Sequence, residues 1–348
     1  MRALTVVPQQ AGSVRVREVE APVAGEGELL VDGVALGICG TDQEIARGEY
    51  GSAPPGEEHL ILGHESLGRV RQAPQGSGFT PGDLVVGVVR RPDPEPCGAC
   101  ARGEFDMCRN GRFTERGIKE IHGYGSQQWT VAADYAVKLD PALERVGVLL
   151  ETASVVAKAW EQIERIGGRA WFEPRRLLVT GAGPIGLLAA LLGVQRGLDV
   201  HVLDRVETGT KPQLVADLGA TYHTGSIADI AAKGEPDVVI EATGASSLIL
   251  DALAHNAHYG IVCLTGLSSS GRKLSIDAGE LNREIVLEND ALFGSVNANL
   301  RHYELAAHAL ARADRSWLER MITRRLPLDR AHEAFEPGGE DVKTVIDL

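Results

Sequence analysis

The alternation of apolar and polar positions changes character once along this chain, near residue 150. Before that point, short apolar and β-branched runs alternate with glycine-rich turns, as in segments 28–35, 66–70 and 83–88. Short strands separated by turn residues at this spacing predict an irregular β-rich domain.

From Thr152 onward, helix-type and strand-type patterns follow one another. Residues 152–166 have helical periodicity. We expect strands at 176–179, 200–203, 237–241 and 260–264, and helices at 186–194, 211–218 and 246–255. This order predicts a right-handed, doubly wound parallel sheet with helices on both faces. A helix at 300–311 is expected to return to the first domain, so residues 1–153 and 294–348 would form one domain and 154–293 the other.

The turn after the first of these strands has the pattern of a pyrophosphate-binding turn. Gly181 permits a tight turn, Gly183 lets bare backbone approach the phosphates, and Gly186 lets the helix pack closely on the strand. The helix N-terminus then faces the anion. Asp204 ends the next strand, where an acidic residue binds the ribose of a dinucleotide. The alternative interpretation is an ordinary strand-to-helix turn of an α/β domain.

Further cofactor contacts are expected at the carboxyl ends of the later strands, because the binding crevice of an open α/β sheet lies there. Plain loop geometry is the alternative. The predicted cofactor contacts are Gly181, Gly183, Pro184, Ile185, Gly186, Asp204, Arg205, Thr243, Gly244, Leu264, Thr265, Leu267, Val296 and Asn297.

A thiol, an imidazole and a carboxylate stand on glycine-flanked loops in the first half of the chain. They are Cys39, His64 and Glu65. Three protein ligands of mixed S, N and O type with an open fourth position describe a catalytic zinc site. Each residue taken singly also has a structural interpretation, since buried cysteines and Gly-His-Glu turns are common. Glu151, where the pattern changes, is either a functional carboxylate or an acid that complements a helix dipole.

Composition narrows the class of protein. The net charge of −13 and the pI near 5.3, without a block of Lys and Arg, argue against a nucleic-acid partner. No apolar run reaches the length of a membrane span, and the start of the chain lacks a signal-peptide pattern, so we expect a cytoplasmic protein without membrane attachment. Three of the five cysteines cluster between 97 and 108, which indicates metal chemistry in a reducing compartment.

The order of these motifs resembles the zinc-dependent medium-chain dehydrogenases. It runs from Gly-Ile-Cys-Gly-Thr-Asp at 37–42 and Gly-His-Glu at 63–65, through the cysteine cluster, to Gly-Ala-Gly-Pro-Ile-Gly at 181–186. More narrowly, segments 113–118, 122–124 and 293–297 resemble the glucose dehydrogenase branch known from archaea. The resemblance implies an α/β protein with a GroES-like catalytic domain and a Rossmann domain. It also implies an enzyme that oxidises C1 of an aldose to the lactone with transfer of a hydride to NAD(P).

Carried over position by position, the resemblance implies roles for individual residues. The zinc ligands would be Cys39, His64, Glu65 and Glu151, with the two carboxylates binding directly or exchanging with substrate and water. The sugar contacts would be Thr41, Glu115, Glu151 and Asn297. Thr41 would also be the first proton acceptor, and the alternative is a hydroxyl that caps the turn after Cys39.

The sequence departs from the family in two places. The family's structural zinc lobe has four cysteines, whereas here only Cys97, Cys100 and Cys108 are present. The fourth ligand would be Asp93, Glu95, Glu104 or Asp106, and otherwise the three thiols are free. Asp204 followed by Arg205 favours NAD over NADP, because a carboxylate repels a 2′-phosphate, although Arg205 could turn toward one.

Two other functions fit the same motifs. One is a zinc dehydrogenase that acts on a secondary alcohol of a polyol or amino sugar. The other is a zinc-free quinone-reductase-like enzyme or a non-catalytic protein that only binds the cofactor. We also expect a homo-oligomer, a dimer or tetramer, with apolar sheet edges such as 260–264 available for pairing.

Overall fold

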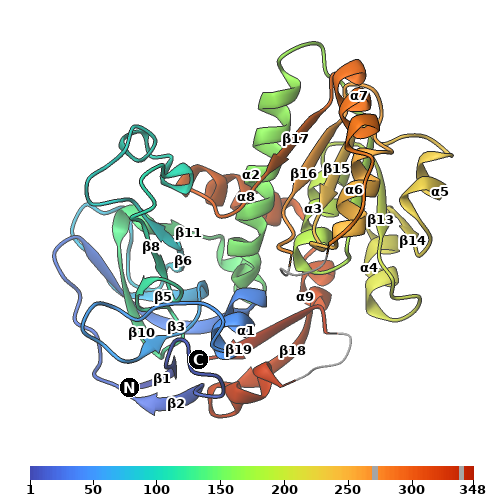
Figure 1. The fold of residues 1–348 in the computed structure, drawn as a ribbon. Helices are drawn as coiled ribbons and strands as arrows, with labels where there is room; N and C mark the ends of the chain where they lie inside the picture. Colours follow the sequence, from blue (N-terminus) through green and yellow to red (C-terminus); the bar gives the residue numbers. More distant parts are fainter. Residues whose placement is uncertain (269–272, 337–340) are drawn as a thin grey trace. The chain divides into compact units, whose positions relative to one another are not determined.

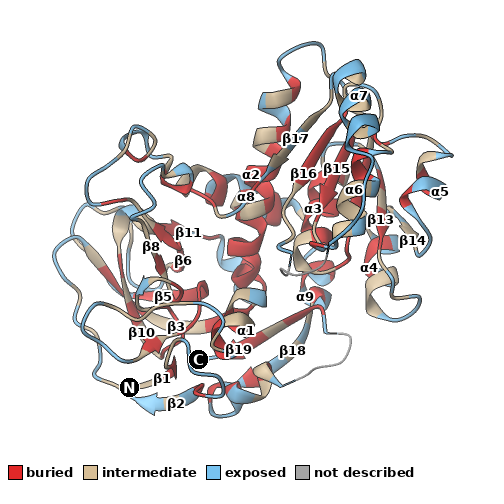
Figure 2. Cartoon of the chain, in the orientation of Figure 1, coloured by how far each residue is buried: buried red, intermediate tan, exposed pale blue. Residues whose placement is uncertain are grey.

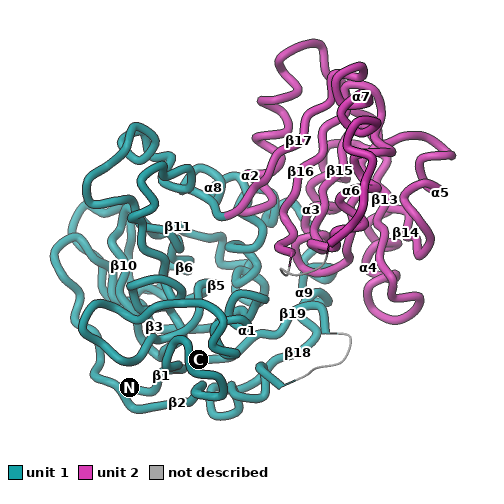
Figure 3. The backbone as a smooth tube through the Cα atoms, viewed as in Figure 1, with its two compact units in different colours: residues 1–154, 297–348 teal, residues 155–296 magenta. Residues whose placement is uncertain are grey.

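The structure is a computed structural model that describes residues 1–268, 273–336 and 341–348, and these residues form two compact units (Figures 1 and 3). Unit 1 comprises Met1–Ser154 and Asn297–Leu348, and unit 2 comprises Val155–Val296. Unit 1 is therefore built from both ends of the chain, and unit 2 is a continuous insertion between them.

Unit 1 is dominated by β-sheets. Its largest sheet has the strand order β11-β6-β5-β3-β19-β18, with β10 also paired to β3. The strands are β3 (Glu28–Ile38), β5 (Glu65–Gln72), β6 (Leu84–Gly87), β10 (Gln128–Ala132), β11 (Ala136–Lys138), β18 (Ile322–Pro327) and β19 (Lys343–Asp347). The long central strand β3 pairs antiparallel with both β5 and β19, so segments from the two ends of the chain meet beside it.

Two smaller sheets and short helices complete unit 1. The sheet orders are β2-β1-β4 and β7-β8-β9. The strands are β1 (Arg2–Val6), β2 (Arg15–Glu18), β4 (Leu60–Ile61), β7 (Arg90–Arg91), β8 (Thr114–Arg116) and β9 (Glu120–Ile121), and the α-helices are α1 (Gly40–Ala46), α8 (Leu300–Arg312) and α9 (Arg315–Met321). Apolar side chains of β1, β3 and β10 pack into one core with residues from the C-terminal segment, such as Ile346.

Unit 2 contains a six-stranded sheet with the order β14-β13-β12-β15-β16-β17, in which every neighbouring pair is parallel. The strands are β12 (Arg176–Thr180), β13 (Asp199–Leu203), β14 (Thr221–His223), β15 (Val238–Glu241), β16 (Ile261–Leu264) and β17 (Ala291–Gly294). The helices are α3 (Pro184–Val194), α4 (Thr210–Asp217), α5 (Ile227–Ala231), α6 (Ser246–Leu253) and α7 (Ala278–Glu288).

Helices cover both faces of this sheet. Leu178 of β12 packs with Ile230 of α5 and Ala252 of α6 on one face. Its neighbour Leu177 points to the other face, where it meets Gly193 of α3. The central strands are buried on both sides (Figure 2). This is the doubly wound parallel sheet that the alternating patterns predicted, because continuous apolar strands need cover on both faces.

One expectation about the sheet edge was wrong. Segment 260–264 does not form an edge, because β16 pairs with β15 on one side and with β17 on the other. The strand at the edge is β17, which the sequence did not reveal because it is short and begins directly after the polar pair Asn289 and Asp290.

The helix α2 (Leu150–Gly167) crosses the division between the units along the chain. Its buried residues Val156 and Trp160 recur at helical spacing, whereas Glu161 lies on a more exposed side. This separation of apolar and polar positions explains why the helix could be predicted from the sequence. Within the ranges that the structure describes, no helix has both the length and the apolar character needed to cross a membrane.

Candidate metal centre and nucleotide site

The register of β3 and β5 brings a thiol and an imidazole together in unit 1. Cys39 follows the last residue of β3, and His64 precedes the first residue of β5, which is Glu65. The Sγ of Cys39 lies 3.1 Å from Nε2 of His64. One ligand atom each of Cys39, His64 and Glu65 lies within 4.8 Å of the others. The three residues therefore offer one sulfur, one nitrogen and one oxygen to a single point, which is a donor set that suits zinc.

Asp42 contacts both Cys39 and His64. Its Oδ2 accepts a hydrogen bond of 3.0 Å from the backbone N–H of Cys39, and its Oδ1 lies 3.4 Å from Nδ1 of His64. Asp42 is fully buried. A carboxylate at Nδ1 favours the tautomer that leaves Nε2 free to bind a metal ion.

Electrostatics at this group favour charged side chains. Burial alone would lower the pKa of His64, but the neighbouring Cys39 and Asp42 raise it well above its usual value. Burial raises the pKa of Asp42, but His64 and the Cys39 N–H outweigh this and lower it. The same electrostatic field that raises the pKa of His64 would stabilise a divalent metal ion bound at this place.

Glu65 is fixed by two residues from distant parts of unit 1. Its Oε1 accepts a hydrogen bond of 3.1 Å from Thr152, and its Oε2 forms a buried ion pair with Lys343. Gly37 lies opposite Glu65 in the β3–β5 pairing, and a Cβ there would lie 2.0 Å from Oε2 of Glu65. The glycine before the Cys39 loop is therefore needed to make room for the carboxylate.

Glu151 and Thr41 lie in the same unit but outside the three-residue group. Burial raises the pKa of Glu151 to about 7, with Glu65 adding to the shift and His64 and Lys343 opposing it. Glu151 can therefore hold or release a proton near neutral pH. Thr41 is half-buried in the first turn of α1. The backbone N–H of Cys39 donates its hydrogen bond to the side chain of Asp42 and not to the hydroxyl of Thr41.

The two predicted sugar contacts, Glu115 and Asn297, contact each other. Nδ2 of Asn297 donates a hydrogen bond of 2.7 Å to Oε1 of Glu115. The same oxygen accepts from Nε and Nη2 of Arg90, at 3.1 and 2.9 Å. Arg90 also lies over the ring of Phe113, with its guanidinium carbon 3.7 Å from the centroid. Asn297 adopts a left-handed backbone conformation, with φ of 62°. The carboxylate of Glu115 is therefore held in one orientation by three donors.

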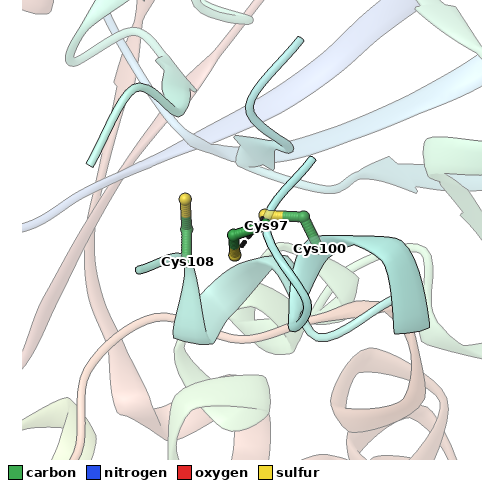
Figure 4. A group of neighbouring side chains, drawn as sticks. All are labelled: Cys97, Cys100 and Cys108. Atoms are coloured by element: carbon green, nitrogen blue, oxygen red, sulfur yellow. Dashed lines mark hydrogen bonds between the residues drawn. The ribbon is translucent and has the colours of Figure 1, made fainter. Parts of the chain in front are cut away.

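The three clustered cysteines form a second candidate metal group (Figure 4). Cys97 precedes η1 (Cys100–Arg102) and Cys108 follows η2 (Phe105–Met107), so the turn of the chain gathers the three sulfurs within 4.8 Å of one another. Backbone N–H groups, that of Arg109 first, lower the pKa of Cys97 to about 6. Burial raises the pKa of Cys100.

In the described part of the chain, none of the four predicted carboxylates joins this sulfur group. Asp93 instead accepts hydrogen bonds from Arg112 and from the backbone of Glu95. Asp106 accepts a hydrogen bond of 2.7 Å from Asn299, and its carbonyl accepts from Arg90.

The glycine turn of unit 2 has the shape expected of a phosphate cradle. Gly181 has a positive φ of 91°. A Cβ at Gly186 would lie 1.7 Å from the carbonyl oxygen of Gly181. A Cβ at Gly183, by contrast, would meet no described atom within 4 Å. Gly186 is therefore needed for the packing of the turn, whereas the space beside Gly183, where α3 begins, is open.

A cavity of about 470 Å³ opens beside this turn, at the carboxyl ends of β12, β13, β14 and β15. Of the predicted cofactor contacts, Gly181, Gly183, Asp204, Arg205 and Thr243 line it. Its remaining lining residues are Leu203, Lys211, Thr224, Gly225, Ala242, Ala245 and Leu248.

The other predicted cofactor contacts do not line this cavity. Pro184, Ile185 and Gly186 form the first turn of α3, and Gly244 follows Thr243 with its N–H bonded to Glu241. Leu264 ends β16 and Thr265 follows it, while Leu267 is exposed. Val296 is exposed, and Asn297 belongs to unit 1.

Sequence reasoning missed several residues that shape these sites. Asp42 could have been found, because it stands three residues after Cys39 at the spacing of a capping pair. Glu241, a fully buried carboxylate that accepts from the backbone of Thr243 and Gly244, also ends a predicted strand. Lys343 gave no local signal, because its partner Glu65 lies at the other end of the chain.

Known families and relatives together match this chain along its full length. Residues 144–348 match the family model for the glucose dehydrogenase C-terminus, and residues 25–141 match that for the alcohol dehydrogenase GroES-like domain. Glucose 1-dehydrogenase of Methanocella arvoryzae is 40% identical over 359 aligned positions, covering 100% of this chain and 99% of that protein. Glucose 1-dehydrogenase 1 of Caldivirga maquilingensis is 38% identical, with the same coverage of both.

A solved structure with a similar fold is the Haloferax mediterranei glucose dehydrogenase in complex with NADP, Zn and gluconolactone. It superimposes with a TM-score of 0.92 at 32% identity and covers 100% of this chain and 99% of the other. These matches, with the sheets described above, confirm the predicted fold class of a GroES-like β-rich domain joined to a Rossmann-type parallel-sheet domain.

Proposed function

This chain belongs to the zinc-dependent medium-chain dehydrogenases, in the glucose dehydrogenase branch known from archaea, and on that basis we propose that it oxidises a glucose-like aldose at C1 to the lactone with hydride transfer to NAD(P). The single observation that carries the proposal is the group of Cys39, His64 and Glu65, because it offers a catalytic donor set in a chain that matches glucose 1-dehydrogenases along its full length.

Cys39 and His64 would hold the zinc ion, and Glu65 and Glu151 would bind it directly or exchange with substrate and water. A zinc ion held there acts as a Lewis acid that lowers the pKa of the sugar's C1 hydroxyl. Asp42 keeps the imidazole oriented, and Lys343 with Thr152 keeps the Glu65 carboxylate in place. The buried carboxyl of Glu151, with a pKa of about 7, can share a proton with water or a sugar hydroxyl near neutral pH.

Oγ1 of Thr41 would accept the proton of the sugar's C1 hydroxyl while its own proton passes by way of the cofactor ribose toward solvent. Its place two residues after Cys39, half-buried in α1, supports this role. Glu115 and Asn297 would bind sugar hydroxyls. Arg90 orients the Glu115 carboxylate before any substrate arrives, so little side-chain ordering is left to be done on binding.

The nucleotide would bind in the cavity beside Gly181 and Gly183, with its pyrophosphate at the N-terminus of α3. The nicotinamide supplies the hydride acceptor. We propose a preference for NAD, with NADP as a second cofactor, because Asp204 directly follows β13, where the ribose 2′-hydroxyl is bound in such folds.

The three-cysteine group of Cys97, Cys100 and Cys108 would bind a structural zinc ion. Its support is the gathering of three sulfurs, two of which receive backbone N–H bonds. A site with three thiolate ligands and one additional ligand is within the chemistry of zinc.

We further propose a cytoplasmic homo-oligomer, a dimer or tetramer. The five free cysteines support a reducing compartment. Among the residues that the structure describes, β17 pairs on one side only, and the Leu292 side chain there is exposed, which supports association. Size-exclusion chromatography with light scattering on the protein and on Leu292→Lys tests this, because loss of the oligomer only in the variant is expected.

The decisive experiment for the function is reduction of NAD and NADP across a panel of aldoses, polyols and amino sugars, with and without a chelator. We expect aldoses to be oxidised, a lactone that hydrolyses to the acid as product, and loss of turnover on metal removal. Turnover of polyols or amino sugars at a secondary alcohol only would favour the first alternative function. Turnover that does not depend on metal would favour the zinc-free one.

A further inference from the structure

The carboxylate of Glu115 is held through one of its two oxygens. Arg90 in β7 lies directly opposite Glu115 in β8 in the antiparallel pairing of these strands. The two donors of Arg90 and the amide of Asn297 all contact Oε1, so Oε2 is left to accept a hydrogen bond from a substrate hydroxyl. The direction in which Oε2 points therefore depends on how firmly Arg90 and Asn297 are themselves held.

Asp106 contacts the segments that carry both of these donors. It lies in the cysteine loop, which we define as residues 97–108. Its backbone carbonyl accepts a hydrogen bond of 2.9 Å from Nη1 of Arg90. Its Oδ1 accepts one of 2.7 Å from Nδ2 of Asn299, which stands two residues after Asn297. Asp106 and Asn299 are 6% and 2% exposed, so water competes little for the hydrogen bond between their side chains.

The turn that carries Asn297 needs such an anchor. Asn297 has a φ of 62°, a backbone conformation that is uncommon for a residue with a side chain. Its Oδ1 accepts a hydrogen bond of 2.8 Å from the N–H of Ala298, which fixes the plane of the amide that donates to Glu115. The turn is thus tied to Glu115 at its first residue and to Asp106 at its third. Release of the tie at Asp106 would let the amide of Asn297 move.

Resting on the proposed function, we propose that Asp106 is a positioning residue for sugar binding. Its side chain fixes the turn that carries Asn297, its carbonyl fixes Arg90, and these two donors orient the carboxylate of Glu115. A binding group has to stay within about 0.5 Å of its productive position, and hydrogen bonds from the residues behind it provide that precision. The cysteine loop thereby contributes to the affinity for the sugar and not only to the stability of unit 1.

Three variants separate positioning from a merely structural role. Asp106→Ala removes the bond to Asn299 and leaves the backbone carbonyl that Arg90 uses. Asp106→Asn keeps the shape of the side chain and an acceptor oxygen, so it is the conservative variant that should rescue the function. Asp83→Ala is the matched control, because Asp83 is also a carboxylate of unit 1, with a side chain 15% exposed and an ion pair of 2.7 Å to Lys138. Circular dichroism and zinc analysis verify that each variant is folded and loaded.

The first measurement is steady-state kinetics with glucose and NAD. We expect Asp106→Ala to raise the KM for glucose at least tenfold, which corresponds to about 1.4 kcal/mol. The kcat and the KM for NAD should change little, because the lost interaction serves sugar binding in the ground state and the transition state alike. Asp106→Asn and Asp83→Ala should keep the KM of the wild-type protein. In an Asn297→Ala background, Asp106→Ala should add almost nothing, because both changes break the same chain of contacts.

The second measurement needs no turnover. Exchange of the Asn297 side-chain amide hydrogens with solvent is followed by NMR in protein labelled with 15N-asparagine, and it should be faster in Asp106→Ala than in the wild-type protein or in Asp83→Ala. Equal exchange in all three overturns the proposal, as does an unchanged KM for glucose or an additive effect in the double variant. If the protein oxidises no aldose, the proposed function fails, and the amide exchange still decides whether Asp106 positions Asn297.

Discussion

Replacing Arg90 with methionine is expected to destabilise unit 1 by removing one member of a buried ion pair. The side chains of Arg90 and Glu115 are 9% and 7% exposed. Without Arg90, the Glu115 carboxylate keeps the amide of Asn297 as a donor, at 2.7 Å, but has lost two charged hydrogen bonds. A methionine fills much of the arginine's volume, so the change tests charge more than packing.

The magnitude follows from the cost of a buried charge that has lost its partner. Leaving one charge of a buried pair uncompensated costs about 3–5 kcal/mol. We therefore expect the free energy of unfolding to fall by about 3–5 kcal/mol at pH 7.

A double variant, Arg90→Met with Glu115→Gln, should regain most of the loss, because no buried charge is then left alone.

The assay is urea unfolding combined with hydrogen exchange at the amides of β3 and β5, which reports on unit 1 separately from unit 2. Arg47→Met is the control, because Arg47 pairs with Glu49 on the surface with both side chains more than half exposed, and its loss should change little. A loss below about 1 kcal/mol for Arg90→Met, or a double variant no more stable than the single one, would refute the reasoning.

Three further predictions concern the two candidate sites and the thiols. Gly186→Ala places a Cβ against the Gly181 carbonyl and should weaken nucleotide binding at least tenfold, or about 1.4 kcal/mol, by calorimetry while zinc content is unchanged; unchanged binding would contradict the tight turn. Asp42→Asn should lower zinc affinity roughly 10–100-fold in competition with a chelator, and an unaltered affinity would remove its orienting role. In the metal-depleted protein at pH 7, iodoacetamide should alkylate Cys97, with its pKa of about 6, well before Cys263, whose burial raises its pKa to about 12. Mass spectrometry of the peptides checks this order, and labelling of Cys263 in the folded protein would contradict it.

The parts of the fold that were predicted from the sequence are those with local signals. The strand at Arg176–Thr180 and the helix at Pro184–Val194 combine apolar runs with glycine punctuation, and both are present. The elements that were missed, such as β14, α5 and β17, have few residues and little periodicity. Their existence depends on the neighbouring strands that they pair with or cover.

The site divides in the same way. Cys39, His64 and Glu65 could be selected because glycines flank them and because their ligand chemistry is distinctive. The residues that control them could not, since Lys343 and Arg90 reach their carboxylates through pairings formed only when distant segments meet. Asp204 is the clearest example. The sequence predicted an acidic residue at this position, but the ion pair of Asp204 with Lys211 forms only because α4 places the lysine beside it.

The central claim is that the metal group of Cys39 and His64 supports hydride removal from C1 of an aldose. Glucose deuterated at C1 tests it, with the label followed into the reduced nucleotide by mass spectrometry. We predict that the zinc-loaded protein transfers deuterium from C1 to the nicotinamide, whereas the metal-depleted protein and Cys39→Ala, which still bind nucleotide, transfer none. Reduced nucleotide that carries no label, or label transferred by the metal-free protein, would contradict the account.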